Sequence, residues 1–121
     1  MKDSYLSREE LVKFIATLPT RRLAAGAVIR NEHGELLLVQ PNYKDGWILP
    51  GGTVEAGEAP KPGCFREVEE ELGLRLAPGR LLLVFHGLAR GVWGDSTYYM
   101  YDAGVIAKNT PVTLQTEELI T

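Results

Sequence analysis

The sequence predicts a single α+β domain, because short apolar runs of strand length alternate with two helical patterns and no linker divides them. Its 121 residues suffice for one hydrophobic core but not for two. The longest apolar runs, residues 36–39 and 81–85, have the length of strands. We find no internal repeat and no low-complexity tract that would mark a second unit.

Composition and charge exclude several classes of partner. The net charge is −3, from 13 Lys and Arg against 16 Asp and Glu, so no positive field attracts a nucleic-acid polymer or a membrane surface. No apolar run is long enough to cross a bilayer, and the charged N-terminus does not resemble a signal peptide. The single Cys64 rules out an internal disulfide and suits a reducing compartment, so we expect a cytoplasmic protein.

The N-terminal segment predicts a helix. Ser7 and Glu10 have the spacing of a capping box, apolar residues recur at helical spacing up to position 18, and Pro19 ends the pattern. We expect residues 1–20 to form a helix that packs on a domain of residues 21–121. Residues 23–30 and 35–40 then predict two strands of a hairpin, joined by a turn.

A second helix follows a glycine pair. A short apolar piece at residues 47–49 leads into Gly51 and Gly52, and a helical pattern runs from Pro62 to Leu72. We expect this late start because the residue before a proline is pushed away from helical angles, and Gly73 stands where a left-handed cap belongs. Residues 81–87 and 96–106 predict further strands, and residues 110–121 a last short one.

The second helix carries a row of acidic residues. Glu67, Glu70 and Glu71 stand at i, i+3 and i+4, so their carboxylates share one face. Like charges placed in this way repel by a few tenths of a kcal/mol per pair, and a divalent cation such as Mg²⁺ reverses that repulsion. A solvated acidic face is the ordinary interpretation of such a row.

Two further features surround this row. Arg66 lies four residues before Glu70 and eight after Glu58, so its guanidinium can hold either carboxylate in place. Gly51 and Gly52 carry no Cβ, so their backbone can approach a metal or a phosphate closely.

The combined pattern G-x5-E-x7-R-E-U-x-E-E-x-G-U (U apolar), from Gly52 to Leu74, resembles the Nudix box. This box is the signature of hydrolases that act on a nucleoside diphosphate linked to another group. The likeness covers the chain from residue 23 to about residue 106. It implies an α/β/α sandwich around a mixed sheet and a small-molecule, nucleotide-type substrate.

The resemblance also implies roles for individual residues. It places one or more Mg²⁺ or Mn²⁺ ions on Glu67, Glu70, Glu71 and the backbone carbonyl of Gly51, with Arg66 and Glu58 supporting the carboxylates. The implied reaction is attack by water on a phosphorus of the diphosphate bridge, assisted by the metal, with Glu67 or Glu70 as the base.

The sequence departs from the family pattern at its end. Relatives continue beyond the position of Thr121 through a further strand and a closing helix. We therefore expect a domain whose C-terminal part is missing, or else an N-terminal helix that covers the open face of the sheet. The oligomeric state stays open, with a homodimer among the alternatives.

Candidate contacts to the substrate are less specific: Trp47, Gly52, His86 and Tyr98. Aromatic rings can stack on a nucleobase, and Tyr43 and Trp93 are alternatives for that role. A lone histidine at a strand end is more often packed or solvated. The arginines at 21, 22 and 90 can bind outer phosphates, although a solvated surface position is the ordinary interpretation of each.

Three functions remain open at this point. The first is a metal-dependent hydrolase of a nucleoside diphosphate derivative, which the complete set of glutamates favours. The second is a module of the same fold that binds a nucleotide or sugar nucleotide without turning it over. The third is an interaction domain whose acidic face is structural.

Overall fold

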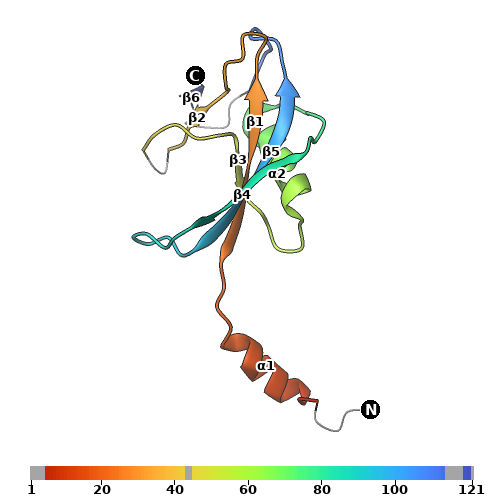
Figure 1. Ribbon diagram of the computed structural model, residues 1–121, viewed down its shortest axis with the longest axis vertical. Coiled ribbons are helices and arrows are strands. Elements are labelled where there is room, and N and C mark those ends of the chain that lie inside the picture. Colours follow the sequence, from red (N-terminus) through yellow and green to blue (C-terminus); the bar gives the residue numbers. More distant parts are fainter. Residues whose placement is uncertain (1–4, 43–44, 114–118, 121) are drawn as a thin grey trace.

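A four-stranded mixed sheet forms the centre of the molecule, in a computed structural model that describes residues 5–42, 45–113 and 119–120. The strand order is β3-β1-β5-β4, and helix α2 packs on this sheet while helix α1 stands apart (Figure 1). Strand β1 is parallel to β5 and antiparallel to β3, and β4 is antiparallel to β5. The strands are β1 (Arg22–Arg30), β3 (Gly51–Thr53), β4 (Leu81–Gly87) and β5 (Ser96–Val105). The fold is therefore α+β with a mixed sheet, as the sequence predicts.

The core lies between β1, β5 and α2 (Pro60–Leu72). The middle of strand β1 consists of the small residues 24–27, of which Ala25 and Ala27 are almost fully buried. Helix α2 buries the apolar face Cys64, Phe65, Val68 and Leu72 against them. Burying a side chain of this size contributes roughly 1.5–3 kcal/mol. This face therefore fixes how α2 lies on the sheet, and with it the direction of its glutamates.

Helix α2 begins at Pro60, two residues before the predicted start. The first-turn N–H groups of a helix have no helical partner, so prolines at 60 and 62 lose no hydrogen bond. The N–H of Gly63 donates to the carbonyl of Ala59 at 3.1 Å and closes the first turn. At the other end Gly73 adopts the left-handed conformation, with φ 69°, which confirms the predicted cap.

The predicted strand at residues 35–40 is shorter in the structure. Only β2 (Val39–Gln40) is a strand, and it pairs with β6 (Leu119–Ile120) in a separate two-stranded sheet. The preceding residues return beside β1 through isolated contacts, such as the 2.9 Å bond from the N–H of Leu37 to the carbonyl of Ile29. The chain therefore reverses direction as predicted, but residues 35–40 do not form a continuous hydrogen-bonded strand beside β1.

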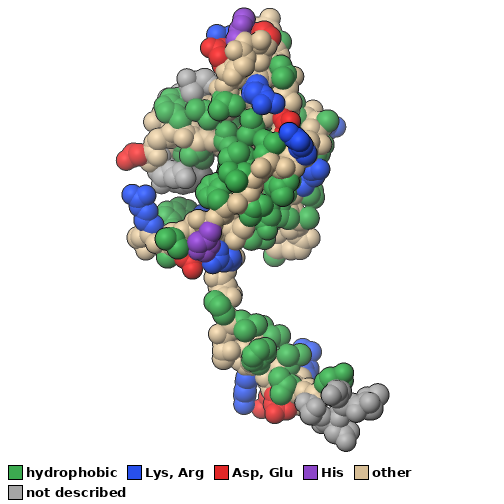
Figure 2. Space-filling model, viewed as in Figure 1, with side chains coloured by type: hydrophobic (Ala, Val, Ile, Leu, Met, Phe, Trp, Pro, Cys, Tyr) green, Lys and Arg blue, Asp and Glu red, His purple; other side chains and the backbone are tan. Residues whose placement is uncertain are grey.

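Helix α1 (Arg8–Ala16) begins with the predicted capping box. The hydroxyl of Ser7 accepts the N–H of Glu10 at 3.1 Å, and the N–H of Ser7 donates to the Glu10 carboxylate at 2.9 Å. No residue of this helix is buried, and Figures 1 and 2 show it away from the sheet. The expected packing on the domain is absent here, because the segment at residues 17–21 leads the helix away. The predicted boundary between an N-terminal helical segment, residues 1–20, and the domain of residues 21–121 stays a prediction.

Strand β4 forms the outer edge of the sheet. Its five apolar residues, 81–85, are each between 40% and 48% exposed, and apolar side chains gather on the surface over the sheet (Figure 2). Among the described residues, α2 is the helix that covers one face of the sheet, and no described helix covers the other face of the sheet. The described part of the chain also contains no helix long and apolar enough to span a membrane.

Candidate active site

Arg66 is the centre of an acidic cluster formed by α2 and the loop before it. Its guanidinium holds Glu58 through two bonds, Nε to Oε2 at 2.7 Å and Nη2 to Oε1 at 2.9 Å. Its Nη1 lies 3.1 Å from Glu55, 3.1 Å from Glu67 and 3.0 Å from Glu70. We call these five residues the Arg66 cluster. The structure thus brings Arg66 into contact with both carboxylates that its sequence spacing allows.

The cluster shifts the ionisation of its members in different directions. The Arg66 hydrogen bonds lower the pKa of the Glu58 carboxyl to about 2, helped by the N–H of Glu55. The same bonds, led by that with Glu58, raise the pKa of Arg66. Burial instead raises the pKa of Glu67, although Arg66 opposes this. Glu58 is therefore a fixed anion at neutral pH, whereas Glu67 accepts a proton more readily than an ordinary glutamate.

The glycine pair on β3 meets the glutamates of α2. The buried carboxylate of Glu71 accepts the N–H of Gly51 at 2.9 Å. The Cα of Gly52 faces Glu67 so closely that a Cβ there would lie 2.8 Å from the Cδ of that side chain. A Cβ on Gly51, whose φ is 148°, would lie 2.0 Å from the carbonyl oxygen of Ala25. Gly51 therefore lets β3 lie close to the backbone of β1, and Gly52 lets β3 approach the Glu67 side chain of α2.

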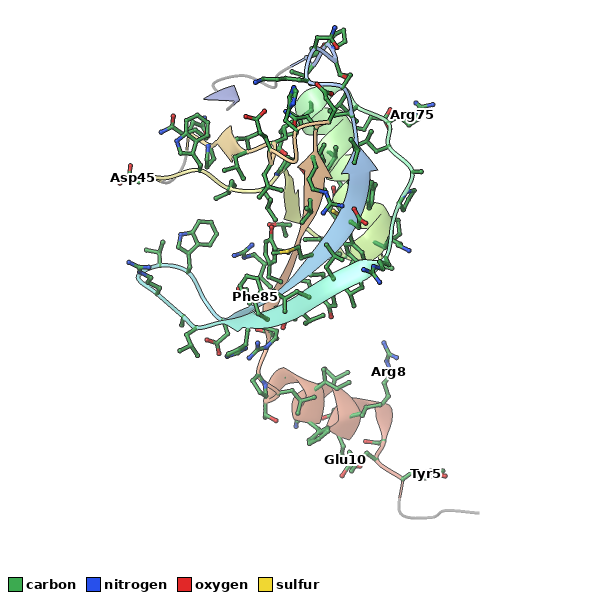
Figure 3. The ribbon with its side chains drawn as sticks, turned by 45° about the horizontal axis from the view of Figure 1, so that its top comes forward. Tyr5, Arg8, Glu10, Asp45, Arg75 and Phe85 are labelled. Carbon is green, nitrogen blue, oxygen red and sulfur yellow. The ribbon has the colours of Figure 1, made fainter. Side chains whose placement is uncertain are left out.

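A cavity of about 1300 Å³ opens in front of this meeting point. Glu67, Glu71, Gly51 and Gly52 line it, whereas Glu70 does not. The loop that carries Asp45 and the β4–β5 connection project to the same side of the molecule, and Phe85 lies on β4 near that connection (Figure 3). Ligand pockets are usually about 300–1,000 Å³, so this cavity has room for a nucleotide-sized molecule.

Cationic and aromatic side chains line another part of the cavity. The Arg22 Cζ lies 5.0 Å from the centroid of the Trp93 ring, and the Arg22 Nη1 lies 3.5 Å from Thr53 Oγ1. Arg90 also lines the cavity and exchanges two backbone hydrogen bonds with Trp93, at 2.8 Å and 2.9 Å. From the sequence, both arginines were candidates for binding outer phosphates, with a solvated surface position as the ordinary interpretation of each. The β1–β3 register that brings Arg22 to this place is a tertiary feature without a local sequence signal.

The structure separates the four candidate substrate contacts into two pairs. Gly52 and Tyr98 line the cavity, and the Tyr98 ring lies 5.0 Å from that of Phe85. Trp47 and His86 are not among the residues that line it; His86 instead contacts Arg21. Tyr43, an alternative candidate for stacking, lies outside the described residues.

A divalent cation is the group that the family pattern implies at this site. In the described part of the chain, no three acidic, histidine or cysteine side chains are arranged to hold one ion together. Glu67 and Glu70 are turned toward Arg66, and Glu71 toward the N–H of Gly51. The donors are nevertheless carboxylate oxygens, which Mg²⁺ prefers, and burial disfavours the Glu67 anion without a counter-charge. The residues present therefore fit a divalent cation by their chemistry.

The fold and site define an α+β protein with a carboxylate-lined cavity between a glycine loop and an acidic helix. The chain belongs to the Nudix family, since the NUDIX domain family model matches residues 20–120. It is 35% identical over 74 residues to a MutT-like protein of Streptomyces ambofaciens, covering 61% of this chain and 48% of that protein. It is 43% identical over 72 residues to diphosphoinositol polyphosphate phosphohydrolase 2 of Rattus norvegicus, covering 58% and 40%.

Solved structures show the same fold. The MutT protein from Methanosarcina mazei Go1 superposes with a TM-score of 0.74 at 28% identity, covering 87% of this chain and 78% of that one. A MutT Nudix hydrolase from Burkholderia pseudomallei gives 0.72 at 26% identity, covering 85% and 82%. The chain spans about half the length, or less, of the curated relatives that it matches.

Proposed function

We propose that the chain is a metal-dependent hydrolase of a phosphoanhydride bond in a nucleoside diphosphate linked to another group. One observation carries this proposal: Glu67 and Glu71 meet Gly51 and Gly52 at the floor of a nucleotide-sized cavity. Membership of the Nudix family and the names of the relatives support it. The substrate is a small molecule such as a nucleotide, a sugar nucleotide or a dinucleoside polyphosphate.

The residues of the site divide the work between them. Glu67, Glu70, Glu71 and the carbonyl of Gly51 would hold Mg²⁺ or Mn²⁺. When bound, the metal lowers the pKa of water and neutralises charge on the bridging oxygens. Glu67 is better placed than Glu70 to take the proton, because it lines the cavity and its pKa is raised by burial.

The side chains of Arg66 and Glu58 hold the glutamates of the site in position. Arg66, anchored by its two bonds to the Glu58 carboxylate, fixes the side of α2 from which Glu67 and Glu70 project. Glu71 also holds the N–H of Gly51, so the glycine loop stays against the helix. The carboxylates and the loop are thereby held in register before any substrate arrives.

A second candidate is a module that binds a nucleotide without hydrolysis. It is favoured by the arrangement in which Arg66 is already paired with Glu67 and Glu70, with no three acidic side chains of the described residues set around one ion. Turnover decides between the two candidates.

The test is incubation with Mg²⁺ and a panel of nucleoside triphosphates, oxidised forms, sugar nucleotides and dinucleoside polyphosphates, with products separated by chromatography. We expect at least one substrate to be cleaved and Glu67→Gln to lower kcat by about 10²–10⁴. The matched control is Glu69→Gln, on the same helix but paired with Arg75 outside the cavity, which should leave kcat unchanged.

One result would overturn the proposal, and another would overturn the role given to Glu67. Binding of a panel member by calorimetry without any product would establish the non-catalytic module. Full activity of Glu67→Gln would show that this carboxylate takes no part in the chemistry.

A further inference from the structure

The cavity contains two arginines that the proposed chemistry does not use. Arg22 and Arg90 line the cavity, and neither forms an ion pair with another residue that the structure describes. Asp45 also lines the cavity and is paired with neither. Four other arginines pair with carboxylates: Arg21, Arg30, Arg66 and Arg75. In a chain of net charge −3, two cations facing one cavity mark a place for an anion.

Trp93 braces one of these cations. The Arg22 guanidinium lies over the indole ring, with its Cζ 5.0 Å from the centroid, where the negative face of the ring attracts the cation. Trp93 is itself held by the paired backbone bonds with Arg90. A guanidinium supported on its face keeps the donors along its edge available for bidentate binding of phosphate.

The position of Arg22 relates this anion site to the glutamates. Its Nη1 lies near Thr53 Oγ1 at 3.5 Å, and Thr53 directly follows Gly52, whose Cα faces Glu67. A phosphate chain with its cleaved bridge at Glu67 that extends past Thr53 therefore approaches Arg22.

We propose that Arg22 and Arg90, with Trp93 as a brace, form an anion subsite for substrate phosphates beyond the bridge that is cleaved. The substrate class is then one with a further phosphate on its leaving side, such as a nucleoside triphosphate, rather than a diphosphate that ends in a neutral sugar. The assignment to substrate rests on the proposed function, but binding of the phosphate chain to these side chains does not.

The first experiment measures binding without metal, so that hydrolysis plays no part. Inorganic triphosphate is titrated in the presence of EDTA into Trp47→Phe, in which Trp93 is the remaining one of the two tryptophans. We expect saturable quenching of Trp93 fluorescence, and weaker binding of orthophosphate. In calorimetry, Arg22→Ala and Arg90→Ala should each raise Kd about tenfold, because each removes a charge-assisted hydrogen-bond donor.

The control and the brace are tested with further variants. Arg80→Ala removes the same charge from an exposed residue outside the cavity, so its Kd should stay at the wild-type value. Trp93→Leu should raise Kd about threefold in the wild-type background and have no effect when Arg22 is already alanine. Equal Kd values for wild type, Arg22→Ala and Arg80→Ala would overturn the subsite. Equal effects of Trp93→Leu in both backgrounds would overturn the brace.

The second experiment uses turnover to assign the anion to the substrate. With Mg²⁺, Arg22→Ala should raise KM about tenfold for a nucleoside triphosphate and leave KM unchanged for a nucleoside diphosphate sugar. An equal loss on both substrates would overturn the assignment to the further phosphate. If triphosphate binds as expected but no substrate is cleaved, the subsite stands and the hydrolase proposal fails.

Discussion

At the level of single residues, Gly51 and Gly52 are adjacent but constrained by different neighbours. The Cβ of a residue at 51 would meet backbone atoms of β1, and its φ of 148° is unfavourable for any side chain. The Cβ of a residue at 52 would meet only the flexible end of Glu67. The first glycine is therefore required by the fold, and the second by the geometry of the site.

Alanine substitutions separate these two requirements. Gly51→Ala should cost about 1–3 kcal/mol and lower Tm by about 5 °C or more, because backbone atoms cannot move aside cheaply. Gly52→Ala should leave Tm within about 2 °C of wild type but reduce kcat/KM about 100-fold, because it displaces the Glu67 carboxylate. Thermal unfolding and steady-state kinetics on both variants check this. The reverse assignment of effects would contradict the geometry.

At the level of elements, the sequence predicted best where local signals agree. Strand β4 (Leu81–Gly87) coincides with its predicted range because a continuous apolar run at residues 81–85 is soon followed by a glycine. Gly73 likewise terminates α2 as expected. Residues 35–38 were predicted as strand but have no continuous partner, because pairing depends on segments distant in the sequence.

The same limit applies to the site. Helical spacing alone places Glu67, Glu70 and Glu71 on one side of α2, and Arg66 within reach of Glu70. That spacing says nothing of Arg22, Arg90 or Trp93, because the register of β1 on β3 and the direction of the β4–β5 connection bring these three to the cavity. Both are set by tertiary packing.

Helix α1 gives a test of the domain boundary. Phe14 and Ile15 are 52% and 54% exposed, so changing both to serine should leave the Tm of the domain within about 1 °C of wild type. The matched control is Leu72→Ala in α2, which empties a fully buried position and should cost about 2–5 kcal/mol. A clear fall in Tm for the α1 variant would show that this helix covers the sheet in solution.

At the level of the whole molecule, the net formal charge of the chain equals the formal charge of the Arg66 cluster. The Arg66 cluster has four glutamates and one arginine, a formal charge of −3, and the entire chain also carries −3. The other ionised residues therefore balance one another.

Metal binding at this cluster should therefore change the electrophoretic mobility of the protein. One divalent cation bound at Glu67 and Glu70 leaves a formal charge near −1, so saturating Mg²⁺ should slow the protein in capillary electrophoresis by about two-thirds at neutral pH. The variant Glu67→Gln with Glu70→Gln should show no such dependence on Mg²⁺. Equal dependence in both proteins would mean that the ion binds elsewhere.

The exposed apolar strand β4 makes the solubility of the protein depend on this change in charge. Copies of a protein near zero charge repel one another weakly, and an uncharged, exposed edge strand is where their backbones can pair. A divalent cation bound at Glu67 and Glu70 would therefore also remove most of the repulsion between copies. Solubility should be lowest when the site is fully loaded, and a chelator should keep concentrated stocks dispersed.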